Sequence, residues 1–241
     1  LGVSRFSEFI HFGLTSQDVT NTAVPLCMKA AWEKVLHPAF DQVLSQIKQM
    51  AADWKAVVML ARTHGQPASP TRLGKEIYVF VDRLTQQIGL LETVPFAAKF
   101  GGATGNFNAH HVAYPEVDWI AFGNRLVNTG LGLHRSQTTT QIEHYDHLAA
   151  FCDALKRINT ILIDMNRDLW LYISMDYFKQ RIKEGDDAAG TRRHLGLHRP
   201  REPILHGEQA GCHRARKRRD GEGADEAGPA LHGGHVAVDD L

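Results

Sequence analysis

The feature that most constrains the fold is an unbroken helical pattern in the second half of the chain. From about His144 to Lys179 no glycine or proline occurs, and a helix of this length would extend about 54 Å. Apolar residues recur every three or four positions, which places them on one helix face; they are Leu148, Phe151, Leu155, Ile158, Leu162, Met165, Leu169 and Ile173. Such length without breakers is typical of elongated bundles. We therefore predict an all-α fold built as a long-helix bundle.

Three further helices are expected upstream. The first covers about residues 17 to 53, with prolines at 25 and 38 that disturb or kink it. The second covers about Thr71 to Thr93 and carries a buried stripe, Leu73, Ile77, Phe80, Val81, Leu84, Ile88 and Leu91. The third covers Pro115 to about Thr129, with Trp119, Phe122, Leu126 and Val127 facing inward. Residues 5–14 also have a helical pattern, which ends at Gly13.

Composition limits the classes of function. The chain has 241 residues, 43% of them hydrophobic, and a formal net charge of zero, which fits one substantial core and predicts no nucleic-acid partner. Its three cysteines lie far apart, which argues for a reducing compartment and against a disulfide frame. No apolar run approaches the roughly 18 residues of a membrane span. We expect a cytoplasmic protein without a membrane partner. Because the chain starts at Leu1, we expect an internal piece of a longer protein, and organellar targeting stays open.

One histidine, His64, lies in the polar stretch Arg62-Thr63-His64-Gly65-Gln66-Pro67. A helix rarely continues through such a glycine and proline, so His64 is expected at a junction between two helices. Imidazole changes charge near neutral pH, which suits a general acid or base. The alternative is an ordinary surface or core histidine.

Two other stretches have polar residues at helix starts or turns. Thr15 and Ser16 precede the first long helix, either as simple caps or as part of a carboxylate or phosphate site at its free N–H groups. The run GGATGNFNAH (residues 101–110) lacks the Lys-Ser/Thr of a phosphate loop and predicts a glycine-rich turn. Its Asn106, Asn108 and His110 either line a polar pocket or satisfy backbone groups.

Two histidines at the start of the last helix offer a possible metal site. His144 and His147 lie three positions apart, beside Glu143 and Asp146. An HExxH pattern is absent, so a solvated first helical turn is the favoured interpretation and no metal is expected.

The composition changes sharply after Gly185. Residues 186–241 contain no Phe, Trp or Tyr and keep no helical or strand period. Such a segment buries too little apolar area to offset its ordering entropy, so we predict a disordered C-terminal tail. Its composition resembles a GC-rich gene read out of frame, and we expect it to be non-native. The alternative for its basic run, residues 214–219, is a nuclear signal or RNA-binding arm.

Five motifs in series resemble the adenylosuccinate lyases of the fumarase/aspartase superfamily. They are EFIHFGLTSQDVTNT, LARTHGQPASPTRLGKE, GGATGNFNAHHVAYPEVDW, TTTQIEHYDHLAAF and RINTILIDMNRDLWLYIS. The resemblance implies an all-α central domain that contributes long helices to a twenty-helix bundle in a homotetramer. It divides the chain into a remnant of an N-terminal domain (1–14), a partial central lyase domain (15–185) and the tail (186–241).

The resemblance also implies a reaction and its residues. Adenylosuccinate loses fumarate to give AMP, and the succinylaminoimidazole carboxamide ribotide of purine nucleotide synthesis loses fumarate in the same way, with no metal or organic cofactor. A base removes a proton next to a carboxylate, and an acid protonates the leaving nitrogen. Matched by motif, His64 is that acid. The implied substrate-binding residues are Thr15, Ser16, Arg62, Thr63, Gln141, Asn106 and Asn108.

The sequence also departs from the family pattern. The family's general base is a serine in a loop of the type GSSTMPHKVNP, whereas this chain continues after Gly185 as Asp186-Asp187-Ala188-Ala189 and contains no such motif. Without this base the chain is expected to be inactive or nearly so alone. Family sites are assembled from several subunits, so the chain could still lend His64 to a partner. The alternatives are another superfamily enzyme, such as argininosuccinate lyase or a cycloisomerase, and a non-catalytic helical assembly subunit.

Overall fold

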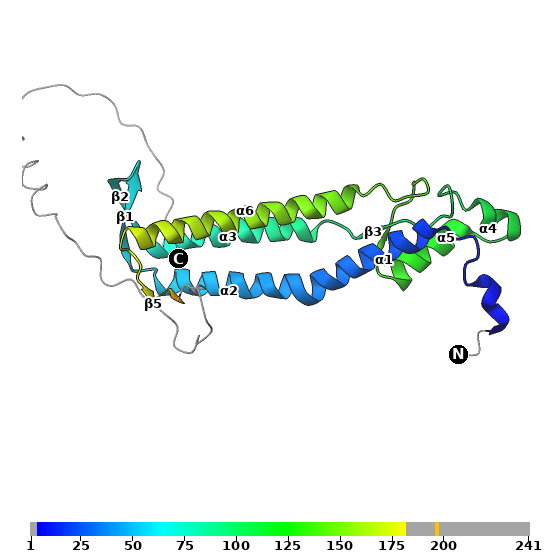
Figure 1. The fold of residues 1–241 in the computed structure, drawn as a ribbon, viewed down its shortest axis with the longest axis horizontal. Helices are drawn as coiled ribbons and strands as arrows, with labels where there is room; N and C mark the ends of the chain where they lie inside the picture. Colours follow the sequence, from blue (N-terminus) through cyan, green and yellow to red (C-terminus); the bar gives the residue numbers. More distant parts are fainter. Residues whose placement is uncertain (1–3, 182–195, 198–241) are drawn as a thin grey trace, which may run out of the picture. The chain divides into compact units, whose positions relative to one another are not determined.

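A computed structural model describes residues 4–181 and 196–197 (Figure 1). The helices are α1 (Ser16–Ala31), α2 (His37–Asp53), α3 (Leu73–Glu92), α4 (Asn108–Ala113), α5 (Trp119–Asn124) and α6 (Asp146–Ser174), with the 3-10 helix η1 (Ser4–Phe9) and the π-helical turns η2 (Trp32–Leu36) and η3 (Arg125–Gly130). The strands are β1 (Val58–Thr63), β2 (Gln66–Arg72), β3 (Ala97–Ala98), β4 (His134–Arg135), β5 (Gln180–Arg181) and β6 (Gly196–Leu197). The prediction of an all-α helical bundle is confirmed. The predicted disordered tail lies, apart from β6, outside the described residues.

The chain divides into two compact units. The first comprises residues 1–50 and 77–166, and the second comprises residues 51–76 and 167–241. In the first unit, α2, α3 and α6 run side by side (Figure 1). Arg83 on α3 pairs with Asp164 on α6, with 2.7 Å between Nη1 and Oδ2.

Apolar side chains of these three helices form the main core. All seven residues of the stripe predicted on α3 are buried, from Leu73 to Leu91. Phe151, Ile158 and Ile161 of α6 and Ile47 of α2 are buried as well. Each fully buried side chain of this size contributes about 1.5–3 kcal/mol, so burial of the apolar faces holds the helices together.

The predicted first helix is confirmed, and its irregularity is a π-helical turn. α1, η2 and α2 follow one another without a break from Ser16 to Asp53. Pro38 has no N–H for the carbonyl of residue 34, and the wider π-helical turn η2 ends just before it. Trp32 of η2 is buried, and its ring lies 6.0 Å from that of Phe151.

The predicted boundaries of two helices and the predicted inward position of one residue were wrong. The third helix begins at Trp119, where the Asp118 carboxylate accepts the Ala121 N–H. Leu126, expected to face inward, is 36% exposed. The last helix ends at Ser174, short of Lys179, because the chain turns at Asp176, whose φ is 62°. The short helix α4 was not expected at all.

The largest departure concerns the stretch around His64. Residues expected to form a loop between helices form the antiparallel hairpin β1–β2 between α2 and α3. Pro67 and Pro70 within β2 argued against a strand, but they lie opposite Arg62 and Leu60 in a two-stranded ribbon that tolerates them. Within the described residues, none of the helices combines the length and hydropathy needed to cross a membrane.

Candidate functional site

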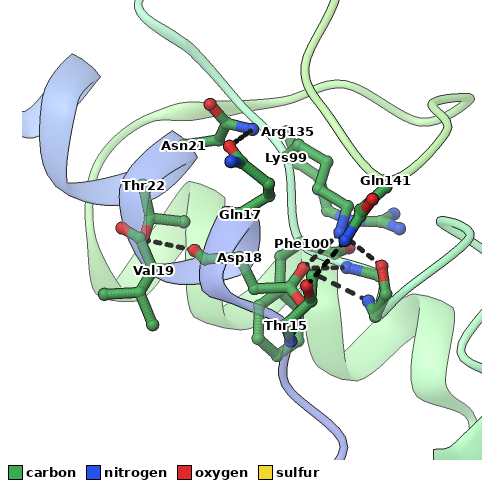
Figure 2. A network of polar contacts seen from close by, with 12 residues as sticks. Thr15, Gln17, Asp18, Val19, Asn21, Thr22, Lys99, Phe100, Arg135 and Gln141 are labelled. Carbon is green, nitrogen blue, oxygen red and sulfur yellow. Dashed lines mark hydrogen bonds and ion pairs between the residues drawn. The ribbon is translucent and has the colours of Figure 1, made fainter.

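Three segments that are far apart in sequence meet at the start of α1 (Figure 2). They are the first turn of α1, the stretch from Lys99 to Gly105, and the stretch from Arg135 to Gln141. We call this group of polar contacts the α1 cluster. It belongs entirely to the first unit.

The Asp18 carboxylate is the centre of the α1 cluster. Its Oδ2 accepts the Thr15 N–H at 2.8 Å, as a capping residue does. Its Oδ1 accepts from the N–H groups of Gly101 at 2.9 Å and Gly102 at 3.2 Å, and from Lys99 Nζ at 2.7 Å. Burial alone raises the pKa of Asp18, but the bonds from Lys99, Thr15 and Gly101 outweigh it, so the pKa lies below the usual carboxyl value.

Lys99 is tied to the same helix by a second contact. Pro25 within α1 has no N–H for the carbonyl of Asn21, and the Lys99 N–H donates to that carbonyl at 3.4 Å. Lys99 Nζ also donates to the Gly102 carbonyl. The side chains of Lys99 and Asp18 are both 0% exposed, so this is a fully buried ion pair.

The predicted residues Thr15 and Gln141 are brought together. Gln141 Nε2 donates to Thr15 Oγ1 at 3.1 Å. Thr15 is half-buried, whereas Ser16 and Gln141 are exposed. Gly105, with φ +80°, lets the glycine-rich turn pass against the carbonyls of Thr139 and Thr140, since a Cβ there would collide with them. Hydroxyl and amide groups next to free helix N–H groups suit a carboxylate.

A buried arginine lies at the start of the third segment. Arg135 is 3% exposed, and its guanidinium donates to the Phe100 carbonyl and to the side chains of Asn124 and Gln137. These partners are neutral, and burial lowers the pKa of Arg135. Its contacts hold the segment that leads to Gln141.

The second unit carries His64 at the tip of the β1–β2 hairpin. Thr63 and Gln66 form the last pair, so His64 and Gly65 are the two turn residues. Both have positive φ, 52° and 75°, as a type I′ turn requires. The imidazole is exposed, as are Arg62 and Thr63. Arg62 supports the turn, because its Nη1 donates to the Gly65 carbonyl at 3.1 Å.

The remaining predicted residues lie in the glycine-rich turn and α4. Asn106 is exposed, and Asn108, the first residue of α4, is exposed and accepts from the Thr104 hydroxyl at 3.2 Å. His110 is 2% exposed among aromatic rings, the nearest being Trp119 at 4.8 Å. Burial lowers its pKa, and its Nδ1 is the buried side-chain atom without a hydrogen-bond partner in the described region. His110 is therefore a core histidine here.

The described residues form a small cavity and contain no metal-binding group. The cavity, about 30 Å³, lies beside α1 and is lined by Asn21, Glu143 and Tyr145 among others. That volume suits a water molecule. Among the described residues no group of three His, Cys, Asp or Glu side chains is placed to hold a metal ion.

Sequence reasoning missed Asp18, Lys99 and Arg135 as site residues. Lys99 had one usable signal, since it is a lone charge in the apolar stretch PFAAKF. Asp18 stands three residues after Thr15, the spacing of a capping box, but its bonds to the glycine-rich turn are tertiary. Arg135 is followed by a polar run, which gives no sign that its side chain is buried.

Comparisons with known proteins identify a family and relatives of this chain. A family model described as "Lyase" matches residues 2–189. Adenylosuccinate lyase of Dictyostelium discoideum is 55% identical over 191 residues, covering 78% of this chain and 41% of that protein. Adenylosuccinate lyase of Escherichia coli K12 is 43% identical over 188 residues, covering 78% of this chain and 41% of that protein. The chain thus spans about two-fifths of the length of these relatives. Because the family model matches well over half of its residues, the chain belongs to the lyase family.

Proposed function

We propose that the chain is part of an adenylosuccinate lyase, a C–N lyase that removes fumarate from adenylosuccinate to give AMP. Residues 15–185 would be part of its central domain, residues 1–14 a remnant of an N-terminal domain, and residues 186–241 a non-native continuation. The names of the relatives at 43–55% identity support this proposal. We extend it to the succinylaminoimidazole carboxamide ribotide, which loses fumarate by the same chemistry.

One observation carries the proposal most directly, namely the residue at the hairpin tip. A type I′ turn is most readily made by Asn-Gly or Asp-Gly, yet its first position holds His64, with φ 52°. The turn requires a positive φ at this position, and histidine is not among the residues that it prefers there. An exposed imidazole at the tip of a hairpin is placed to act on a bound ligand.

The chemistry divides between the two groups of residues. A base removes a proton from the carbon next to a succinyl carboxylate, the C–N bond breaks, and His64 gives its proton to the departing nitrogen. Thr15, Ser16 and Gln141, at the α1 cluster, bind the carboxylates. Asn106 and Asn108, in or directly after the glycine-rich turn, are also proposed to contact the substrate. Arg62 and Thr63 shape the turn. The base is proposed to come from a segment or subunit other than the described residues.

We further propose a homotetramer in the cytoplasm. Large apolar side chains are exposed on α2, α3 and α6, among them Val43, Leu90, Ile163 and Trp170, the last 70% exposed. Exposed large apolar side chains on long helices suit burial against other copies.

A chimeric enzyme tests the proposed function. Residues 2–185 of this chain replace the matched segment of the Escherichia coli relative, which keeps its own flanking segments. We expect the purified chimera to release fumarate from adenylosuccinate, measured by absorbance, and not from argininosuccinate. Release from argininosuccinate alone would favour the other superfamily enzyme. A folded, assembled chimera with no turnover would favour a non-catalytic assembly subunit.

A further inference from the structure

The hairpin that carries His64 receives little support from its own two strands. An isolated two-stranded hairpin is marginally stable in water, and β2 is exposed along most of its length. Pro70 lies opposite Leu60 and Pro67 opposite Arg62. The Leu73 N–H donates to the Val57 carbonyl at 2.9 Å, and pairs in an antiparallel ladder alternate between bonded and non-bonded, so Leu60 and Pro70 form a non-bonded pair. The Leu60 carbonyl therefore points away from β2 and needs a donor from elsewhere.

A tyrosine that lies 117 positions later in the chain supplies this donor. The Tyr177 hydroxyl donates to the Leu60 carbonyl at 2.9 Å. The same oxygen accepts from Arg62 Nε at 3.4 Å, and Arg62 Nη1 reaches the Gly65 carbonyl. A continuous series of hydrogen bonds therefore runs from Tyr177 to the residue that follows His64.

Tyr177 is itself firmly held. The chain turns directly after α6, and the N–H groups of Tyr177 and Phe178 donate to the Tyr172 carbonyl at 2.9 and 3.3 Å. Phe178 is 2% exposed, and its ring lies 5.3 Å from that of Trp54. All of these residues belong to the second unit, so the hydroxyl group is fixed with respect to the base of the hairpin.

We propose that Tyr177 is a positioning residue for His64. Its hydroxyl bonds the Leu60 carbonyl on the side of β1 that faces away from β2, and so fixes the direction in which the hairpin presents the imidazole. The effect of this contact on catalysis rests on the proposed function of His64, whereas the contact is itself a feature of the structure.

The substitution Tyr177→Phe tests the contact in the full 241-residue chain. It removes one oxygen atom and keeps the ring. We expect the amide protons of Thr63 and Gln66, which close the turn, to exchange about fivefold faster in NMR hydrogen-exchange experiments, the factor that loss of one ordinary hydrogen bond produces. The His64 Cε1–H resonance should shift at the same time, while exchange in α1 stays unchanged.

Tyr172→Phe is the matched control. The Tyr172 ring contacts that of Tyr177 at 6.0 Å, but its hydroxyl makes no hydrogen bond to the described hairpin residues. We expect wild-type exchange at Thr63 and Gln66 in this variant. Wild-type exchange in Tyr177→Phe as well would overturn the proposal, as would equal acceleration in both variants.

The chimera adds a catalytic readout that a purely structural role would not change. In the chimera, Tyr177→Phe should lower kcat about tenfold and change KM by less than about twofold, because a displaced acid impairs proton transfer more than substrate binding. An unchanged kcat contradicts the positioning role. If the unsubstituted chimera releases no fumarate, the proposed function fails, and the exchange experiment still decides whether Tyr177 holds the hairpin.

Discussion

Replacing either member of the buried pair Asp18–Lys99 should have unequal effects on stability. In Lys99→Met, the Asp18 carboxylate keeps three backbone N–H donors, at 2.8, 2.9 and 3.2 Å. We expect a loss of about 1–3 kcal/mol, the cost of one hydrogen bond to a charged group. In Asp18→Asn, the buried ammonium of Lys99 loses its anionic partner. This should cost about 3–5 kcal/mol.

Urea unfolding followed by circular dichroism at pH 7 measures these differences. In thermal unfolding of a chain of this size, a loss of 1 kcal/mol in the free energy of unfolding lowers Tm by about 2–4 °C. Asp18→Asn should therefore lower Tm by about 10 °C. The double variant should be more stable than Asp18→Asn alone, because it contains no unpaired ammonium. The reasoning would be refuted if the two single variants lost equal free energies of unfolding and these losses added fully in the double variant.

The same pair predicts a pH dependence. The pKa of Asp18 in the folded chain lies below its usual value of 3.8, so the folded state binds this proton less readily than the unfolded state. The contribution of Asp18 to the free energy of unfolding is therefore complete above pH 3.8 and is lost as the pH falls below it. The stability difference between wild type and Asp18→Asn should shrink in that acidic range.

Three other outcomes are expected. The purified 241-residue chain mixed with adenylosuccinate should release no fumarate above background, because it lacks the family's base loop, and clear turnover would contradict the proposal that the base comes from elsewhere. Gly105→Ala should lower Tm and disturb the neighbouring Thr139 backbone, seen by NMR, because its φ of +80° and the close carbonyls leave no room for a Cβ. In a spectrophotometric titration one tyrosine should ionise only near pH 12, since burial raises the pKa of Tyr172 to about 12, and Tyr172→Phe should remove that step.

Helix-forming stretches could be predicted from the sequence because their signal is local and repeated. The stripe on α3 was right at every position, since burial of one face leaves a regular spacing. Leu126 was placed wrongly because η3 is a π-helical turn, which shifts the face that an α-helical period assigns.

The hairpin and the α1 cluster depend on contacts that a linear pattern does not contain. Pro67 and Pro70 argue against a strand when read alone, and only the pairing with β1 shows positions where their missing N–H groups are tolerated. Lys99 reads as a surface lysine until Asp18 is placed beside it. Tyr177 had no sequence signal, because its partner Leu60 lies 117 residues away.

The proposed function depends on the imidazole of His64 giving a proton to the departing nitrogen. The most direct test is His64→Asn in the chimera, because Asn-Gly is a preferred type I′ pair and should keep the turn. We predict a fall in kcat with adenylosuccinate of about 10²- to 10⁴-fold, the range for loss of a general acid, with KM nearly unchanged. If the His64→Asn chimera turned over adenylosuccinate as fast as the unsubstituted chimera, His64 would not be the general acid.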